Sequence, residues 1–196
     1  TAARKHAIDL LAQVGIVADG VFAPLLLSFA EIELGGSVAR VGYPDAPREL
    51  VVIDWDSMDF ATLRRSSETT LEYVSRAEQL TWDGPDGPVH AWWYPPTNPG
   101  FVAPTDELPP ILVRSHGGPT GYSASVFGLD NQYWTSRGVG VLDVNYGGSY
   151  GYGRAYRNRL YGTWGITDVQ DCIDAVRVVV DRGLADPRRI AIMGGS

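Results

Sequence analysis

The sequence contains a single cysteine, Cys172, and a single lysine, Lys5, among its 196 residues. One cysteine excludes an intrachain disulfide and a metal cluster of the cysteine type, and it fits a reducing compartment such as the cytoplasm. The other basic residues are arginine, and the formal net charge of −7 argues against a nucleic-acid partner. The longest apolar run, Val21–Ala30, contains a proline and is too short to span a bilayer. We therefore expect a cytoplasmic protein with no nucleic-acid and no membrane partner.

Recognisable nucleotide-binding motifs are also missing, although 23 residues are glycine. The glycine-rich stretch 145–153 contains neither G-x-x-x-x-G-K-[ST] nor G-x-G-x-x-G, and we expect no cofactor. The sequence does not start with methionine, and it ends inside a motif discussed below. We therefore expect it to be a fragment of a longer protein.

Within the first third of the chain, only residues 37–65 give a clear prediction of β-structure. Residues 1–36 suggest no function. Between residues 37 and 65, short β-branched segments joined by polar turns predict an antiparallel meander. Such a meander is typical of a propeller blade, and an isolated sheet in any all-β domain is the alternative. The small polar stretch 66–70 predicts a linker between two domains.

The pattern changes to alternating strands and helices after a predicted hairpin over residues 78–94. The proline-rich stretch 95–99 follows this hairpin, and no central strand would tolerate such a run. Alternation of strands and helices predicts a mainly parallel sheet with helices on both faces. The predicted strands are Ile111–Ser115, Val139–Val144 and Ile190–Met193, and the predicted helices are 123–137, 154–160 and 168–182. The last helix is expected to have Val169, Cys172, Ile173, Val176 and Val180 on one apolar face.

Two of these strands lead into motifs that carry chemistry. The last strand leads into Gly194-Gly195-Ser196, the first half of a G-x-S-x-G nucleophile elbow. Another strand leads into His116-Gly117-Gly118-Pro119, a turn of the type that supplies a backbone N–H to an oxyanion hole. Acyl transfer needs both a nucleophile and such a donor. The pair therefore predicts Ser196 as the nucleophile and the Gly118 N–H as an oxyanion donor.

Four further residues are candidates for the wall of a substrate pocket: His116, Gly117, Tyr146 and Tyr152. For Tyr146 and Tyr152, packing of the core or of a loop is the alternative. His116 could instead be the general base. Three aspartates, Asp168, Asp171 and Asp174, recur at helical spacing and could suggest a metal site. We expect no metal there, because a solvated helix face favoured by the helix dipole explains them more simply.

These motifs together resemble the prolyl oligopeptidase family of serine peptidases, in its acylaminoacyl-peptidase and dipeptidyl-aminopeptidase branch. The resemblance implies a β-propeller followed by an α/β-hydrolase domain, with Ser196 as nucleophile and the catalytic acid and histidine after it. One departure is Gly147, because the family usually has an arginine after Asn-Tyr. The segments that carry the resemblance are 94–99, 116–119, 145–153, Trp164-Gly165, Asp168-Val169 and 194–196.

The sequence thus predicts the end of a β-propeller over residues 1–70 and the first half of an α/β-hydrolase domain over residues 71–196. The intact protein is expected to hydrolyse short peptides through an acyl-enzyme, and it could form a homo-oligomer. The 196-residue chain alone is expected to be inactive. A carboxylesterase is the first alternative function. A truncated, non-catalytic interaction protein is the second.

Overall fold

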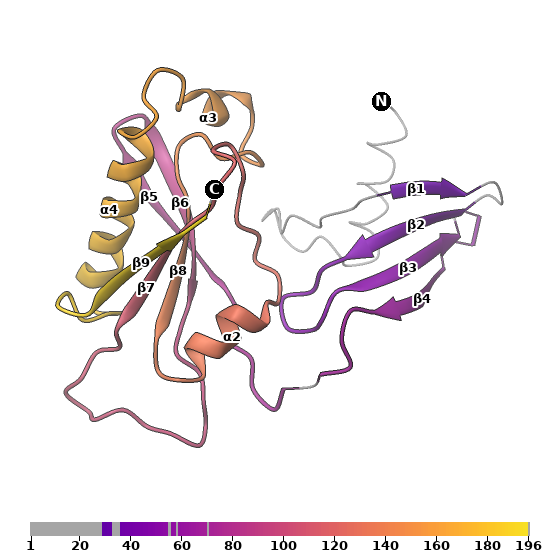
Figure 1. Ribbon diagram of the computed structural model, residues 1–196, viewed down its shortest axis with the longest axis horizontal. Coiled ribbons are helices and arrows are strands. Elements are labelled where there is room, and N and C mark those ends of the chain that lie inside the picture. Colours follow the sequence, from indigo (N-terminus) through magenta and orange to yellow (C-terminus); the bar gives the residue numbers. More distant parts are fainter. Residues whose placement is uncertain (1–28, 33–35, 55, 58, 70, 196) are drawn as a thin grey trace.

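The computed structural model describes residues 29–32, 36–54, 56–57, 59–69 and 71–195, which form two separate β-sheets (Figure 1). Much of the stretch 1–36, and Ser196 itself, lie outside the described residues. None of the helices in the described part of the chain has the length and apolarity needed to cross a membrane.

The first sheet has four strands in sequential order, and every neighbouring pair is antiparallel. The meander predicted for residues 37–65 is confirmed, with one more strand before it. Its small core consists of side chains that alternate along two strands, because successive residues of a strand point to opposite faces. The strands are β1 (Phe29–Ile32), β2 (Gly36–Val41), β3 (Glu49–Asp54) and β4 (Phe60–Arg65), and the core residues are Ala39, Val41, Val51 and Ile53.

The second sheet has five strands in the order β5-β6-β8-β7-β9. The three strands predicted to be parallel neighbours are parallel, and β7 lies between β8 and β9. The hairpin pairs antiparallel with β8 through β6. These strands are β5 (Glu78–Gly84), β6 (Gly87–Tyr94), β7 (Ile111–Ser115), β8 (Gly140–Asn145) and β9 (Ile190–Gly194).

The prolines after the hairpin argued against a central position for its second strand, and the position of β6 corrects that expectation. This strand is paired on both sides, so it is an interior strand. The last paired residue is Tyr94, and the prolines begin directly after it. Pro95, Pro96 and Pro99 therefore remove no hydrogen bond from the ladder, because the ladder has already ended before them.

Helices cover both faces of the second sheet, as predicted. Alternation along β6 separates its two tryptophans: Trp93 packs in a cluster with the long helix α4, and Trp92 packs in a cluster with Trp134 of α2. Figure 1 shows these two helices on different sides of the strands. The helices are α2 (Leu129–Thr135), α3 (Arg154–Asn158) and α4 (Thr167–Asp181).

The helix predicted from residue 123 begins only at Leu129. Residues 123–128 are irregular because their backbone groups have partners outside a helix. The Ser123 N–H donates to the Asn145 side chain at 2.7 Å. The Phe127 N–H donates to the carbonyl oxygen of Tyr43 at 2.7 Å. The second of these bonds also joins the two sheets.

The buried face of α4 differs from the predicted one. Cys172 is buried as expected, but Val169 and Ile173 are 50% and 43% exposed. The helix instead buries Asp171, Ala175 and Val179 beside Cys172. Helical periodicity permits either of two neighbouring stripes, and the observed stripe is the one that brings Asp171 against the sheet edge.

A group of charged side chains built around the buried Asp143 lies at α2, on the opposite face. Arg114 and Asp143 are cross-strand partners in β7 and β8, with Arg114 Nε 3.2 Å from Asp143 Oδ1. Arg114 also pairs with Asp130 at 2.6 Å and contacts Asn131. Burial raises the pKa of Asp143 from the ordinary value of 3.8 to about 6, although Arg114 opposes the shift.

The raised pKa of Asp143 predicts a pH-dependent loss of stability. Below about pH 4 the carboxyl is neutral in both the folded and the unfolded states. Between about pH 4 and pH 6 the unfolded chain ionises first, so the free energy of unfolding falls, by about 3 kcal/mol for a shift of roughly two units. The Asp143→Asn variant should lack this decline. Urea unfolding of the intact protein and the variant from pH 4 to pH 7 measures it, and parallel profiles would contradict the assignment.

Candidate functional site

The carboxyl ends of the three parallel strands meet at one edge of the second sheet. Ser115, at the end of β7, is in register with Val144 of β8 and with Gly194 of β9. The segments that follow the three strands therefore start side by side (Figure 1). Ligands bind at this edge in open α/β sheets. Ser196 lies outside the described residues, but Gly194, two positions before it, pairs beside the start of the His116 turn.

Residues 116–119, here called the HGGP turn, need glycine for conformational reasons. Gly118 has a φ of +94°, a conformation that side chains rarely tolerate. The turn is closed by the Gly121 N–H, which donates to the Gly117 carbonyl oxygen at 3.2 Å. Gly118 is exposed, and its amide is absent from the hydrogen bonds formed between described residues. An N–H without a partner among the described residues is what an oxyanion donor requires at this position.

The HGGP turn is fastened to residues 145–153, here called the glycine loop. His116 Nε2 lies 2.7 Å from Ser149 Oγ, and the His116 ring stacks on Tyr146 with centroids 4.4 Å apart. The Tyr146 hydroxyl lies 2.6 Å from the carbonyl oxygen of Pro119 and 2.9 Å from that of His116. Burial lowers the pKa of His116. The structure therefore brings His116 and Tyr146 together, in contact with each other.

Asn145 connects the glycine loop to the irregular segment 123–128, which follows the HGGP turn. Its side chain is fully buried and bonds both the N–H and the carbonyl oxygen of Ser123, at 2.7 and 3.0 Å. The same amide nitrogen donates to the Tyr152 hydroxyl at 3.1 Å. Tyr156 of α3 donates to the Asn145 backbone oxygen at 2.5 Å. Sequence reasoning overlooked Asn145; its position as a polar residue at the end of an apolar strand was the available signal.

Of the two pocket-wall tyrosines, Tyr146 is 3% exposed and Tyr152 is half-buried. Tyr152 stacks flat on His90, with ring centroids 4.3 Å apart and planes 4° from parallel. Burial raises the pKa of Tyr146 to about 12. These contacts agree with the packing alternative for both tyrosines.

Tyr122 and Tyr150 are more exposed than Tyr146, and neither was predicted from the sequence as a pocket residue. Their ring centroids are 4.3 Å apart, and Tyr150 is 45% exposed. The Tyr150 N–H donates to the Gly121 carbonyl oxygen at 3.1 Å, which puts this pair directly beside the HGGP turn. The exposed aromatic surface near Gly118 thus comes from Tyr150 rather than from Tyr146.

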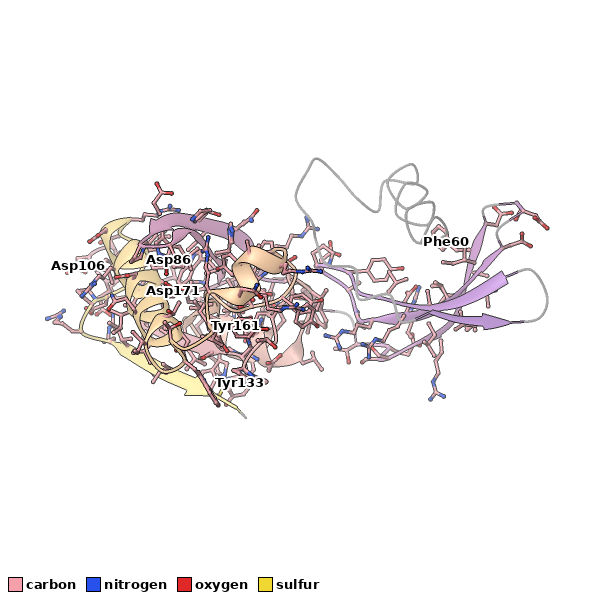
Figure 2. The ribbon with its side chains drawn as sticks, turned by 90° about the horizontal axis from the view of Figure 1, so that it is seen from above. Phe60, Asp86, Asp106, Tyr133, Tyr161 and Asp171 are labelled. Atoms are coloured by element: carbon pink, nitrogen blue, oxygen red, sulfur yellow. The ribbon has the colours of Figure 1, made fainter. Side chains whose placement is uncertain are left out.

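Asp171 is the clearest correction at the site. It was expected on a solvated helix face, but it is 4% exposed and its Oδ2 accepts the Gly147 N–H at 2.7 Å. Figure 2 labels Asp171 on α4 within the packed side chains around the second sheet, far from Phe60 on the first sheet. Burial raises its pKa, while the Gly147 N–H and the charge of Arg159 oppose that shift. The glycine loop is therefore anchored to α4 by a buried carboxylate.

The other two aspartates of the series, Asp168 and Asp174, contact groups that are close to them in sequence. Asp168 accepts the Gly165 N–H at 2.7 Å, and Asp174 pairs with Arg177 at 2.7 Å. Within the residues that the structure describes, no group of three or more His, Cys, Asp or Glu side chains could hold a metal ion.

A hollow of about 590 Å³ lies at the opposite, amino ends of β7 and β9. Its charged groups pair among themselves: Arg189 with Asp186 and Glu107, and Arg188 with Asp186. This hollow is remote from the HGGP turn and the glycine loop, and its paired charges leave little to recognise a ligand.

The comparisons with known proteins agree with this geometry. The family model described as "Prolyl oligopeptidase family" matches residues 125–196. An acylamino-acid-releasing enzyme of Arabidopsis thaliana is 41% identical over 87 residues, which are 44% of this chain and 11% of that protein. Dipeptidyl aminopeptidase BIII of Pseudoxanthomonas mexicana is 39% identical over 91 residues, 46% of this chain and 13% of that protein.

Solved structures cover more of the chain. A puromycin-hydrolyzing peptidase of Mycobacterium tuberculosis is 50% identical, with a TM-score of 0.78 over 83% of this chain and 26% of that one. A puromycin hydrolase structure is 41% identical, with a TM-score of 0.79 over 86% of this chain and 26% of that one. The chain thus spans roughly a tenth to an eighth of these curated relatives and about a quarter of these solved chains.

The anchoring role of Asp171 predicts unequal effects of two substitutions. Asp171→Ala leaves the buried Gly147 N–H without an acceptor, and it should lower the free energy of unfolding by about 1–3 kcal/mol. Asp171→Asn keeps an acceptor oxygen and should lower it by less. Denaturant unfolding measures both, and hydrogen exchange of the Gly147 amide should accelerate only in the alanine variant.

Asp174→Ala is the matched control, because Asp174 lies one turn along the same helix and its partners, Arg177 and Gln170, are exposed side chains of that helix. Its effect should stay within about 0.5 kcal/mol, as for other surface pairs. If Asp171→Ala proved as mild as Asp174→Ala, the anchor would be unimportant.

Proposed function

The chain belongs to the prolyl oligopeptidase family, and from this we propose that the intact protein is a serine peptidase that hydrolyses short peptides. The observation that carries the proposal is the register of β7 and β9, which pairs Gly194, two residues before Ser196 in sequence, with Ser115 at the start of the HGGP turn. Peptide substrates are supported by relatives named acylamino-acid-releasing enzyme and dipeptidyl aminopeptidase. The proposal covers substrates with either an acylated or a free amino terminus.

In this proposal Ser196 Oγ attacks the scissile carbonyl carbon, and its proton passes to a general base. The carbonyl oxygen becomes an oxyanion and accepts the Gly118 N–H. The tetrahedral intermediate then collapses: the scissile C–N bond breaks, and the amine leaves with the proton held by the base, which gives the acyl-enzyme. Water, deprotonated by the same base, attacks the acyl-enzyme, releases the carboxylic acid and restores the serine hydroxyl. Neither described histidine is assigned as the base, because His116 is fastened to Ser149 and His90 is stacked on Tyr152.

The substrate approaches the HGGP turn past Tyr150 and Tyr122. We assign this aromatic pair to the pocket wall, since it flanks Gly121 and Tyr150 is exposed to solvent. Gly117 and Gly118 supply the floor of the site. Tyr146 and Tyr152 shape the wall from behind through their contacts with His116 and Asn145.

The domain organisation is also part of the proposal. We assign β1–β4 to the last blade of a propeller, supported by a four-stranded antiparallel meander that precedes the mixed sheet. The boundary is placed at residue 70, after the small polar stretch 66–69, with the hydrolase domain over residues 71–196. A propeller beside the catalytic edge would limit access to short peptides. A cytoplasmic location is supported by the single cysteine in the sequence.

Replacement of the nucleophile tests the proposal directly. Ser196→Ala in the intact protein should abolish peptide hydrolysis and labelling by a fluorophosphonate probe, because no other hydroxyl takes its place. Turnover of short peptides is compared with turnover of a p-nitrophenyl ester. Ester cleavage without peptide cleavage would favour a carboxylesterase, and full peptide hydrolysis by the variant would refute the role of Ser196.

The oxyanion donor is tested by two substitutions at one position. Gly118→Pro removes the N–H, and Gly118→Ala keeps it; both strain a backbone with φ of +94°. The proline variant should lose an additional factor on the order of 10²–10³ in kcat relative to the alanine variant. Equal kcat values for the two variants would remove Gly118 from the oxyanion hole.

A further inference from the structure

The hydroxyl of Ser149 is fully buried and lies between a ring nitrogen and a carbonyl oxygen. Its Oγ is 2.7 Å from the Tyr146 carbonyl oxygen and 2.7 Å from His116 Nε2. A carbonyl oxygen can only accept, so the single hydroxyl proton is directed to Tyr146. His116 must then donate its Nε2 proton to Ser149. The serine thereby selects one tautomer of the imidazole.

The other ring nitrogen of His116 is enclosed as well. Nδ1 lies 3.3 Å from the Tyr146 hydroxyl oxygen and 3.2 Å from the Gly117 carbonyl oxygen. The Tyr146 ring covers one face of the imidazole at a centroid distance of 4.4 Å. Burial lowers the pKa of His116, which keeps the ring neutral near pH 7. His116 is thus a neutral donor with a fixed orientation.

The partner of this donor sits on a firmly held element. Gly147 is bound by Asp171, and the Gly148 N–H donates to the Tyr156 carbonyl oxygen at 3.0 Å. The glycine loop at Ser149 is therefore tied to both α3 and α4. By contrast, Gly118 is exposed, and it lies two residues after His116. Orientation of the His116 ring fixes the start of the turn that aims the Gly118 N–H.

We propose that Ser149 is a positioning residue, which holds the HGGP turn through His116 so that the Gly118 N–H points at the developing oxyanion. The proposal rests on the proposed peptidase function for its catalytic consequence. Ser149 touches neither the substrate nor Ser196 in this scheme. It acts by restricting the motion of the donor, because a donor misplaced by about 1 Å can cost on the order of 100-fold in rate.

The test compares Ser149→Ala with Ser75→Ala in the intact protein. Ser75 is a matched control: it is 1% exposed, and its hydroxyl donates to the Pro95 carbonyl oxygen at 2.6 Å, away from the HGGP turn. Ser149→Ala should lower kcat by about 10- to 100-fold with KM changed by less than about threefold, since the loss falls on transition-state stabilisation. Ser75→Ala should leave kcat unchanged. Ser149→Thr, which keeps the hydroxyl, should recover part of the loss.

A readout independent of activity accompanies the kinetics. Hydrogen exchange of the peptide that contains residues 117–121 should accelerate in Ser149→Ala and not in Ser75→Ala. Unchanged exchange would overturn the link between Ser149 and the turn. Faster exchange with unchanged kcat would overturn the positioning role. If the unaltered protein hydrolysed no peptide or ester, the proposed function would fail by itself, and the exchange data would still decide whether Ser149 holds the turn.

A double-mutant cycle adds a second criterion. His116→Ala should reduce kcat by a factor similar to that of Ser149→Ala, and the double variant should be no worse than the poorer single variant, because the two groups act as one unit. Additive losses would mean that Ser149 does not act through His116.

Discussion

Parallel pairing of β7 with both of its neighbours is the constraint on which the site depends. Parallel strands present their carboxyl ends at the same edge, so the segments that follow β8 and β9 each start one strand spacing from the segment that follows β7. The HGGP turn, the glycine loop and the Gly194 segment are brought together by backbone hydrogen bonds. No side chain has to reach across the sheet to assemble them. Side chains are left free to fix the loops in place.

Burial then explains the chemistry of the glycine loop. Every residue from Val141 to Ser149 is buried, and a buried backbone that has left its strand must find other hydrogen-bond partners. Side chains supply many of these partners. The Asn145 side chain accepts the Ser123 N–H, the Asp171 carboxylate accepts the Gly147 N–H, and the Tyr156 hydroxyl donates to the Asn145 carbonyl oxygen. Small glycines let these groups approach, and tyrosines combine an apolar ring with a terminal hydroxyl. The composition of the loop therefore reflects a buried polar network rather than a cradle for an anion.

Most of the fold could be predicted from the sequence, but the buried hydrogen-bond network of the glycine loop could not. Short apolar runs followed by glycine-rich turns identified β7, β8 and β9, because strand length and turn chemistry are local properties. Asp171 was misplaced, because its burial depends on which of two adjacent stripes of α4 faces the sheet. The sequence predicts a helix from residue 123. Residues 123–128 are irregular in the structure because they bond to Asn145 and Tyr43, which are far away in sequence and leave no local signal. Ser149 likewise acquires its role only when His116 is brought beside it.

Gly147 shows how the network adapts to the departure from the family pattern. A side chain at this position would start about 3.2 Å from Asp171 Oδ2 and 3.3 Å from the Cβ of Arg159. An arginine at position 147 and Arg159 would therefore compete for the same space beside one buried carboxylate. In this chain the Arg159 guanidinium lies 4.4 Å from the Tyr156 ring centroid and 2.8 Å from the Pro88 carbonyl oxygen, and its charge opposes the rise in the pKa of Asp171. The positive charge near Asp171 thus comes from the residue that follows α3 instead of from the loop. Because the Gly147 N–H still binds Asp171, the loop keeps its anchor without the arginine.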